Sequence, residues 1–236
     1  MVKGKQFDHY RDVGNPVTVA RVYNSQKVDE LIFLDIAPTQ ESKEIVENII
    51  KETSKECFMP LTLGGGVKDI DDFKRFLNAG ADKVSVNTAS VTNPELIEKA
   101  SLRYGKQCVV LSVDYKVDEN GKRKVYIHSG KTKTELDPLE HIQHCIQLGA
   151  GEVFLTSIDH EGKMNGYDFD FLKQVSSEIT VPLIASGGAG KLNDFYKALV
   201  DCQVSAVSAG SLFHFTDQSP IKTRFFLKEK GLQIRI

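Results

Sequence analysis

Two pairs of glycines, each at the end of a short apolar run, are the residues of this chain best suited to bind an anion. Gly65 and Gly66 form one pair, and Gly187 and Gly188 form the other, 122 positions later. A glycine backbone can approach an anion closely, and the N–H groups at the start of a helix carry partial positive charge. Each pair therefore predicts a phosphate site in front of a helix. A tight turn that was duplicated with the rest of the chain would give the same pattern.

The glycine pairs belong to a longer internal repeat. The stretch 65–73 returns as 187–195, and the same shift places Glu30 on Glu152. In each half, a second apolar run ends in small polar residues that suit the same anion: Asn87 and Thr88 in the first half, and Gly210 and Ser211 in the second. The chain therefore contains one phosphate-site design twice.

Three acidic residues end apolar runs and could do acid or base chemistry: Asp35, Asp114 and Asp159. A carboxylate in such a place can also simply cap the next loop, and for each of the three this interpretation stays open. Asp114 is the strongest candidate, because the run before it is strongly apolar. Burial disfavours the ionised form of a carboxyl group and raises its pKa toward neutrality, which suits general acid–base catalysis.

Histidines and cysteines give no metal signal. His141 and His144 stand three apart on an expected helix, but without a third ligand at a metal-binding spacing we interpret the pair as a solvated helix face. Four cysteines without a C-x-x-C spacing are expected to be reduced thiols: Cys57, Cys108, Cys145 and Cys202. The sequence predicts neither a metal nor an organic cofactor.

Apolar, β-branched runs alternate with amphipathic stretches along the whole chain. The apolar runs predict seven buried strands, at 31–35, 59–63, 83–87, 108–114, 153–158, 182–185 and 206–209. The amphipathic stretches predict eight helices, at 16–27, 40–53, 70–79, 94–103, 138–148, 169–177, 192–200 and 220–230. In the fourth helix, Asn93 is the expected N-cap and Pro94 the first helical residue. The segment 116–126, with Asn120 before Gly121, predicts an inserted hairpin.

This alternation predicts an α/β fold, a parallel (β/α)8 barrel in a single domain, with a doubly wound open sheet as the alternative. The internal repeat favours the barrel, built of two half-barrels. In such a barrel the loops after the strands form one face, so both phosphate sites should lie at the same mouth. Two clamps there predict an elongated substrate with a phosphate at each end and Asp114 between them.

Composition fits a protein of the cytoplasm. The 236 residues are 41% hydrophobic and carry a formal net charge of -2, so no basic excess points to nucleic acid. No apolar run is long enough to span a membrane, and residues 1–5 do not lead into the apolar core of a signal peptide.

At seven places the chain resembles the cyclase subunits of imidazole glycerol phosphate synthase, the HisF family of histidine biosynthesis. The matching runs are 63–66, 81–89, 149–152, 155–159, 166–168, 184–190 and 213–215. The resemblance implies a TIM-type barrel of two half-barrels and a lyase-type enzyme that works with a HisH-type glutaminase. In that family, ammonia from the glutaminase converts a bis-phosphorylated ribulosyl carboxamide nucleotide (PRFAR) into imidazole glycerol phosphate and an aminoimidazole carboxamide ribotide (AICAR).

The resemblance also assigns roles to residues. It makes Asp114 a general acid–base catalyst and Lys3, in the first loop, a flexible lysine that faces the substrate. It assigns one phosphate to Gly65, Gly66, Asn87 and Thr88, and the other to Gly187, Gly188, Gly210 and Ser211. At the opposite face it implies a charged ring through which ammonia enters, made of Glu30, Lys83 and Glu152, and a glutaminase docking surface that includes Asp82 and Gln107. Charges at the bottom of a barrel also serve solubility or stability alone.

Two departures from the family pattern affect the function. Where the family has Asp-x-Asp-Gly after the sixth strand, this chain has Asp159, His160, Glu161 and Gly162. The family's second catalytic aspartate ends the first strand, and the alignment places that residue before Met1. We therefore expect a barrel that is short at its N-terminus and lacks the first β-strand.

These departures leave two other functions open. One is that of a HisF-like paralogue that supplies ammonia for the amidation of a surface-polysaccharide sugar. The other is that of a non-catalytic scaffold that only activates the glutaminase.

Overall fold

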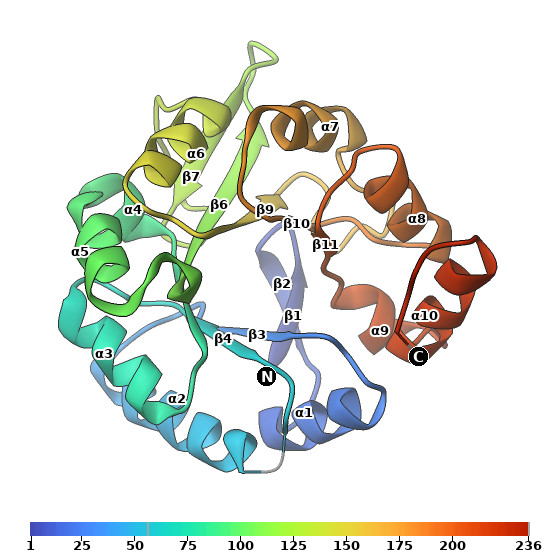
Figure 1. Ribbon diagram of the computed structural model, residues 1–236, viewed down its shortest axis with the longest axis horizontal. Coiled ribbons are helices and arrows are strands. Elements are labelled where there is room, and N and C mark those ends of the chain that lie inside the picture. Colours follow the sequence, from blue (N-terminus) through green and yellow to red (C-terminus); the bar gives the residue numbers. More distant parts are fainter. Residues whose placement is uncertain (56, 236) are drawn as a thin grey trace.

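A curled, largely parallel sheet surrounded by helices forms the computed structural model, which describes residues 1–55 and 57–235 (Figure 1). The seven predicted strands are confirmed and lie side by side in the order β3-β4-β5-β6-β9-β10-β11, all parallel to their neighbours. Their bounds are β3 Leu31–Leu34, β4 Leu61–Gly64, β5 Lys83–Val86, β6 Val109–Val117, β9 Glu152–Ser157, β10 Leu183–Ser186 and β11 Ala206–Val207. This curled parallel sheet agrees with the TIM-type barrel that the resemblance implies.

The eight predicted helices are present within a few residues of their expected bounds. They are α1 Pro16–Ser25, α2 Gln40–Ser54, α3 Ile70–Ala79, α5 Glu95–Tyr104, α6 Pro138–Gln147, α7 Phe169–Glu178, α8 Leu192–Val200 and α10 Pro220–Glu229. In Figure 1 they form an outer layer around the strands. Their apolar faces pack on the sheet, as Phe73 and Phe76 of α3 show, because both are buried.

Two short helices and a 3-10 turn were not predicted. Helix α4 (Thr88–Thr92) follows β5, α9 (Ser211–Phe215) follows β11, and the turn η1 (Lys106–Cys108) precedes β6. Five residues are too few to show a helical period in the sequence. The predicted N-cap role of Asn93 is wrong, because the Asn93 N–H donates to the Ala89 carbonyl and ends α4, and α5 begins only at Glu95.

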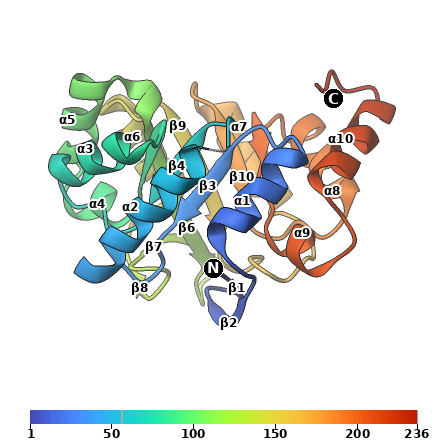
Figure 2. The same ribbon diagram turned by 90° about the horizontal axis from the view of Figure 1, so that it is seen from below.

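Two hairpins extend from the sheet region. The predicted one is confirmed, since β6 pairs antiparallel with β7 (Arg123–Ile127), which pairs in turn with β8 (Thr132–Lys133). The second, β1 (Val2–Lys5) with β2 (Asp8–Asp12), was not predicted. Figure 2 shows both hairpins on the same side of the molecule, at the carboxyl ends of the parallel strands.

The internal repeat is visible in the strand register. Leu34 lies opposite Gly64 in the first half, and Thr156 lies opposite Ser186 in the second, each 122 positions further on. The first glycine of each pair has a positive φ, +98° at Gly65 and +87° at Gly187. A side chain there would collide with the backbone of Asp35 or of Ser157, which occupy equivalent places in the two halves. Both glycines are therefore also required by packing.

In the described part of the chain, β3 and β11 are the two ends of the parallel sheet. The side chains between the strands come from both halves and form a buried layer of Val110, Phe154 and Ile184, with Ile32 and Ala206 against it. None of the described helices is both long and apolar enough to cross a membrane.

Candidate active site

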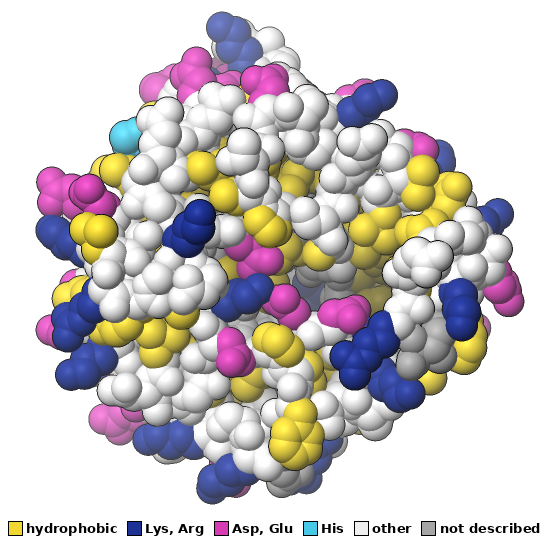
Figure 3. Space-filling model, viewed as in Figure 1, with side chains coloured by type: hydrophobic (Ala, Val, Ile, Leu, Met, Phe, Trp, Pro, Cys, Tyr) yellow, Lys and Arg dark blue, Asp and Glu magenta, His cyan; other side chains and the backbone are white. Residues whose placement is uncertain are grey.

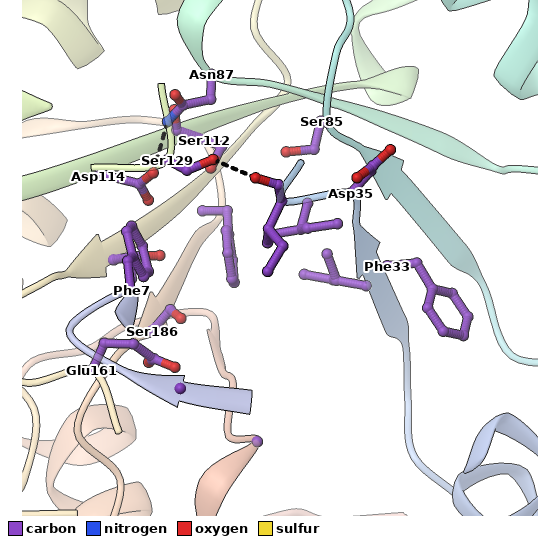
Figure 4. Close-up of a pocket in the computed structure, with 18 of the residues that line it drawn as sticks. Phe7, Phe33, Asp35, Ser85, Asn87, Ser112, Asp114, Ser129, Glu161 and Ser186 are labelled. Atoms are coloured by element: carbon purple, nitrogen blue, oxygen red, sulfur yellow. Dashed lines mark hydrogen bonds between the residues drawn. The ribbon is translucent and has the colours of Figure 1, made fainter. Parts of the chain in front are cut away.

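A large cavity opens at the carboxyl ends of the parallel strands. Its volume is about 1030 Å³, and residues of both halves of the chain line it. All ten residues expected to bind substrate or do chemistry lie in its wall: Lys3, Gly65, Gly66, Asn87, Thr88, Asp114, Gly187, Gly188, Gly210 and Ser211. Figure 4 shows Asp114 and Asn87 together on one wall and Asp35 with Ser85 on another.

Asp114 is buried in this wall, with only 9% of its surface exposed. The amide Nδ2 of Asn87 donates to its Oδ2 over 3.1 Å and also to the carbonyl of Ser112. Burial raises the pKa of Asp114 to about 7, and the negative charge of Glu161 adds to this, while hydrogen bonds from Thr156 and Asn87 oppose it. Asp114 can therefore gain and lose a proton near neutral pH.

Lys3 reaches the cavity from the N-terminal hairpin. It lies in strand β1 and not in a loop as expected, and its Nζ is 2.7 Å from Oε1 of Glu161. The backbone N–H of Gln6 donates to the Glu161 carbonyl, so the hairpin is attached to the loop after β9. Glu161 is a departure from the family pattern, but the sequence did not place it in the site, since its ion pair joins residues 158 positions apart.

The other two acids predicted at strand ends, Asp159 and Asp35, accept hydrogen bonds from backbone N–H groups. Asp159 accepts a hydrogen bond from the Val117 N–H over 2.9 Å, so it ties the β6–β7 hairpin to the loop after β9. Asp35 accepts from the Ala37 N–H over 3.0 Å and lines the cavity.

The glycine pairs precede α3 and α8, and the other residues predicted to bind phosphate lie at the starts of α4 and α9: Asn87, Thr88, Gly210 and Ser211. The N-terminus of α3 holds the carboxylate of Asp69, which accepts from two backbone N–H groups, and the N–H groups before α8 donate to Asp194. In contrast, no side chain caps α4 or α9, whose first residues line the cavity. The first N–H groups of a helix lack intrahelical partners and favour an anion.

The hydroxyl of Ser211, at the start of α9, supports this assignment. Its Oγ is buried and has no hydrogen-bond partner among the described residues. A buried polar atom without a partner is costly, and a bound phosphate oxygen would satisfy it.

The tip of the β7–β8 hairpin forms part of the cavity wall, which the sequence did not predict. The His128 N–H donates to Thr88 Oγ1, and the Ser129 hydroxyl donates to the Ile36 carbonyl over 2.9 Å. No pattern within the hairpin itself signals these contacts, because their partners lie about forty and ninety positions earlier.

The expected solvated face of α6 is wrong at His141. This side chain is buried, and burial lowers its pKa to about 4, whereas His144 is exposed. The four cysteines form no disulfides with one another, and within residues 1–55 and 57–235 no three His, Cys, Asp or Glu side chains are grouped closely enough to hold a metal ion.

At the opposite face, where the strands begin, Lys83 lies between two glutamates. Its Nζ is 2.9 Å from Oε2 of Glu30 and 2.8 Å from Oε2 of Glu152. Figure 3 shows acidic and basic side chains together near the middle of one face. Asp82 and Gln107 make local contacts at the same end of the sheet, accepting from the Leu61 N–H and donating to the Tyr104 carbonyl.

The fold is of the (β/α) barrel type, and its cavity holds a buried carboxyl, that of Asp114, with two uncapped helix ends in the same wall. The sequence profile of a family described as "Histidine biosynthesis protein" matches residues 1–219. The chain belongs to this family.

Similar curated proteins carry one name, "Imidazole glycerol phosphate synthase subunit HisF". The protein of Dehalococcoides mccartyi strain BAV1 is 46% identical over 236 residues, which is all of this chain and 93% of the relative. That of Clostridium botulinum strain 657 is 43% identical over 238 residues, covering 100% and 94% of the two chains. That of Alkaliphilus metalliredigens is 40% identical over 235 residues, covering 100% and 93%.

Proposed function

We propose that this chain is the cyclase subunit of imidazole glycerol phosphate synthase, which uses ammonia to turn PRFAR into imidazole glycerol phosphate and AICAR. One observation carries the proposal: a buried carboxyl, that of Asp114, lies in a cavity with a phosphate-type site in each half of the chain. A substrate with a phosphate at each end would span such a cavity and present its middle to this carboxyl.

Asp114 is the proposed proton donor and acceptor. A general acid–base group works best when its pKa is near the working pH, and the pKa of Asp114 is raised to about 7. The Asn87 amide holds the carboxyl in place, and the negative charge of Glu161 favours its protonated form. Lys3, paired with Glu161, is placed to contact a substrate at the second phosphate site, since it lies against Gly210.

The proposed ammonia source is a HisH-type glutaminase bound at the opposite face. The contact of Lys83 with Glu30 and Glu152 would form the ring through which ammonia enters, and Asp82 and Gln107 would lie at the docking surface. The enzyme would work in the cytoplasm, where the four thiols stay reduced.

Steady-state turnover with ammonium salts tests this function without a partner. The protein should convert PRFAR into imidazole glycerol phosphate, and Asp114→Asn should lower kcat by about 10²–10⁴-fold while PRFAR still binds, because an amide fills the same space but cannot transfer the proton. Asp159→Asn is the matched control, since this carboxylate serves the hairpin backbone.

Two results would contradict the proposal. Binding of a glutaminase with its activation but no turnover would identify a scaffold. Binding of a phosphorylated sugar in preference to PRFAR would identify the sugar-amidating paralogue.

A further inference from the structure

A chain of buried hydrogen bonds leads from helix α6 to the catalytic carboxyl. His141 Nε2 lies 2.9 Å from Oγ of Ser90 in α4. The Ser90 hydroxyl donates to the carbonyl of Asn87 over 2.7 Å, and the Asn87 amide donates to Asp114 over 3.1 Å. The mechanism above uses only the last of these contacts.

The direction of these bonds fixes the tautomer of His141. A serine hydroxyl has one proton, and that of Ser90 is donated to the Asn87 carbonyl, so Ser90 can only accept from the imidazole. His141 must therefore carry its proton on Nε2. Because burial lowers the pKa of His141 to about 4, the ring is neutral at physiological pH and its Nδ1 is free to accept. The Cys145 Sγ lies 3.9 Å from Nδ1 and 3.8 Å from Nε2, so the thiol contacts the ring without facing either nitrogen alone.

The contact matters because of the unusual place of Asn87. This residue precedes α4 with φ -111° and ψ -88°, and its side chain does not cap the helix. The amide instead points into the cavity toward Asp114 (Figure 4). The first turn of α4 is closed by Ser90, whose N–H and hydroxyl both donate to the Asn87 carbonyl. Ser90 thus holds the Asn87 backbone, and His141 holds the Ser90 hydroxyl.

We propose that His141 is a positioning residue of the active site, which acts through Ser90 to keep the Asn87 amide in hydrogen-bond contact with Asp114. Only the effect of His141 on turnover depends on the proposed function. Its effect on the Asp114 carboxyl exists whether or not the protein is a cyclase. His141 itself cannot touch the substrate, because it is buried between α4 and α6.

The test must take account of the charged and titratable groups beside His141 and Asp114, which are the two ends of this chain of hydrogen bonds. His144 is the charged neighbour that acts on His141, and Cys145 contacts its ring. Asp114 is influenced by Glu161, which favours its protonated form, and by Asn87 and Thr156, which favour the carboxylate. Losing the Asn87 contact must therefore raise the pKa of Asp114 further.

The test is a titration of Asp114 by carboxyl ¹³C NMR, with Asp114→Asn to assign the signal. His141→Leu and Ser90→Ala should raise the midpoint by roughly half a unit to one unit, a part of the effect of losing the hydrogen bond from Asn87 to the carboxylate. His141→Gln keeps an N–H donor and should stay near the wild-type value. Ile142→Val, a buried neighbour on the same helix, is the packing control and should not move the midpoint.

Asn87→Ala sets the largest shift that this pathway can give, and adding His141→Leu to it should change nothing more. The proposal is wrong if His141→Leu and Ser90→Ala leave the midpoint unchanged, if Asn87→Ala has no effect, or if Ile142→Val shifts it as far as His141→Leu. Absence of turnover in every variant and in the wild type would count against the proposed function alone.

Discussion

At the scale of single residues, the proton affinity of Asp114 couples chemistry to stability. Its pKa rises from 3.8 to about 7 on folding. Below the lower value both states hold the proton. Between the two values the unfolded chain ionises while the folded protein does not, so stability falls as pH rises, by on the order of 1.4 kcal/mol per pH unit, and levels off above the folded pKa.

The Asp114→Asn variant should therefore be more stable than the wild type at pH 8, and this advantage should shrink as the pH falls toward 4. The amide has no proton to lose and suits the same buried position. Urea unfolding at pH 4.5, 6 and 8 measures the difference between the two proteins. If the two stabilities change in parallel over this range, the carboxyl keeps an ordinary pKa and is a poor acid–base catalyst.

The two proposed phosphate sites can be tested separately by small changes of side chain. Ser211→Ala removes a hydroxyl from the second site, and Thr88→Val removes one from the first. Each should weaken binding of the bis-phosphate substrate by about tenfold or more, because hydrogen bonds to a charged group are worth roughly 1.5–3 kcal/mol. Calorimetry with PRFAR measures this loss. A mono-phosphate sugar should respond mainly to one of the two changes.

Ser211→Ala carries its own control, since the hydroxyl has no partner among the described residues and its loss should not lower stability. Equal, negligible effects of both variants on binding would remove the phosphate assignment. Substituting Gly65 or Gly187 is a less clear test, because any side chain there collides with backbone and disturbs the fold as well.

At the scale of elements, one ion pair attaches the β6–β7 hairpin to helix α7. Arg123 donates to Asp168 through Nε and Nη2, over 3.0 and 3.1 Å, and its guanidinium lies 4.6 Å from the ring centroid of Phe171. Asp168 also accepts from the Tyr115 hydroxyl and caps α7. Since Tyr115 follows Asp114 directly, this attachment steadies the part of β6 that carries the Asp114 carboxyl.

Arg123→Met should destabilise the protein by roughly 1–3 kcal/mol, because the mostly buried Asp168 carboxylate would lose its cationic partner and two of its hydrogen bonds. Thermal or urea unfolding measures the loss. Lys99→Met in the exposed pair with Glu95 is the control, expected within about 0.5 kcal/mol. A loss no larger than that of the control would show that the hairpin is held by its strand pairing alone.

At the scale of the whole molecule, the central strands of the sheet pair on both sides, whereas the end strands β3 and β11 pair on one side within the described part of the chain. Strand β6 pairs on both sides and its residues 109–115 are buried, whereas β3 pairs only with β4 and is half-exposed. The Leu31 N–H donates to the Pro60 carbonyl and the Asp35 N–H to the Gly64 carbonyl, so both point toward β4. The N–H groups of Ile32 and Leu34 alternate with them along the strand and therefore point to the open side.

Amide hydrogen exchange should therefore be slowest in β6 and β9, and faster at Ile32 and Leu34 than at Leu31 and Asp35. Two-dimensional NMR or mass spectrometry with fragmentation resolves these positions. Slow exchange at Ile32 and Leu34 would show that another strand covers this edge in solution.

The sequence by itself determined the parts of this protein that depend on short-range patterns. Apolar runs fixed the seven parallel strands, amphipathic stretches fixed the eight long helices, and the repeat indicated that the two halves share a register. Asp114 could be found because it ends a strongly apolar run, which forms the most buried strand. These properties are encoded locally, so a period of two or 3.6 residues and a glycine pair reveal them.

Only the tertiary structure decided how the site is completed. Asp69 caps the start of α3 and Asp194 accepts from the N–H groups just before α8, whereas no side chain caps α4 or α9, whose first residues line the cavity. Glu161 meets Lys3 across 158 positions, and His141 is buried against Ser90 although its sequence neighbours suggest an exposed face. Contacts of this kind depend on which elements lie beside one another in space, and no local pattern contains that information.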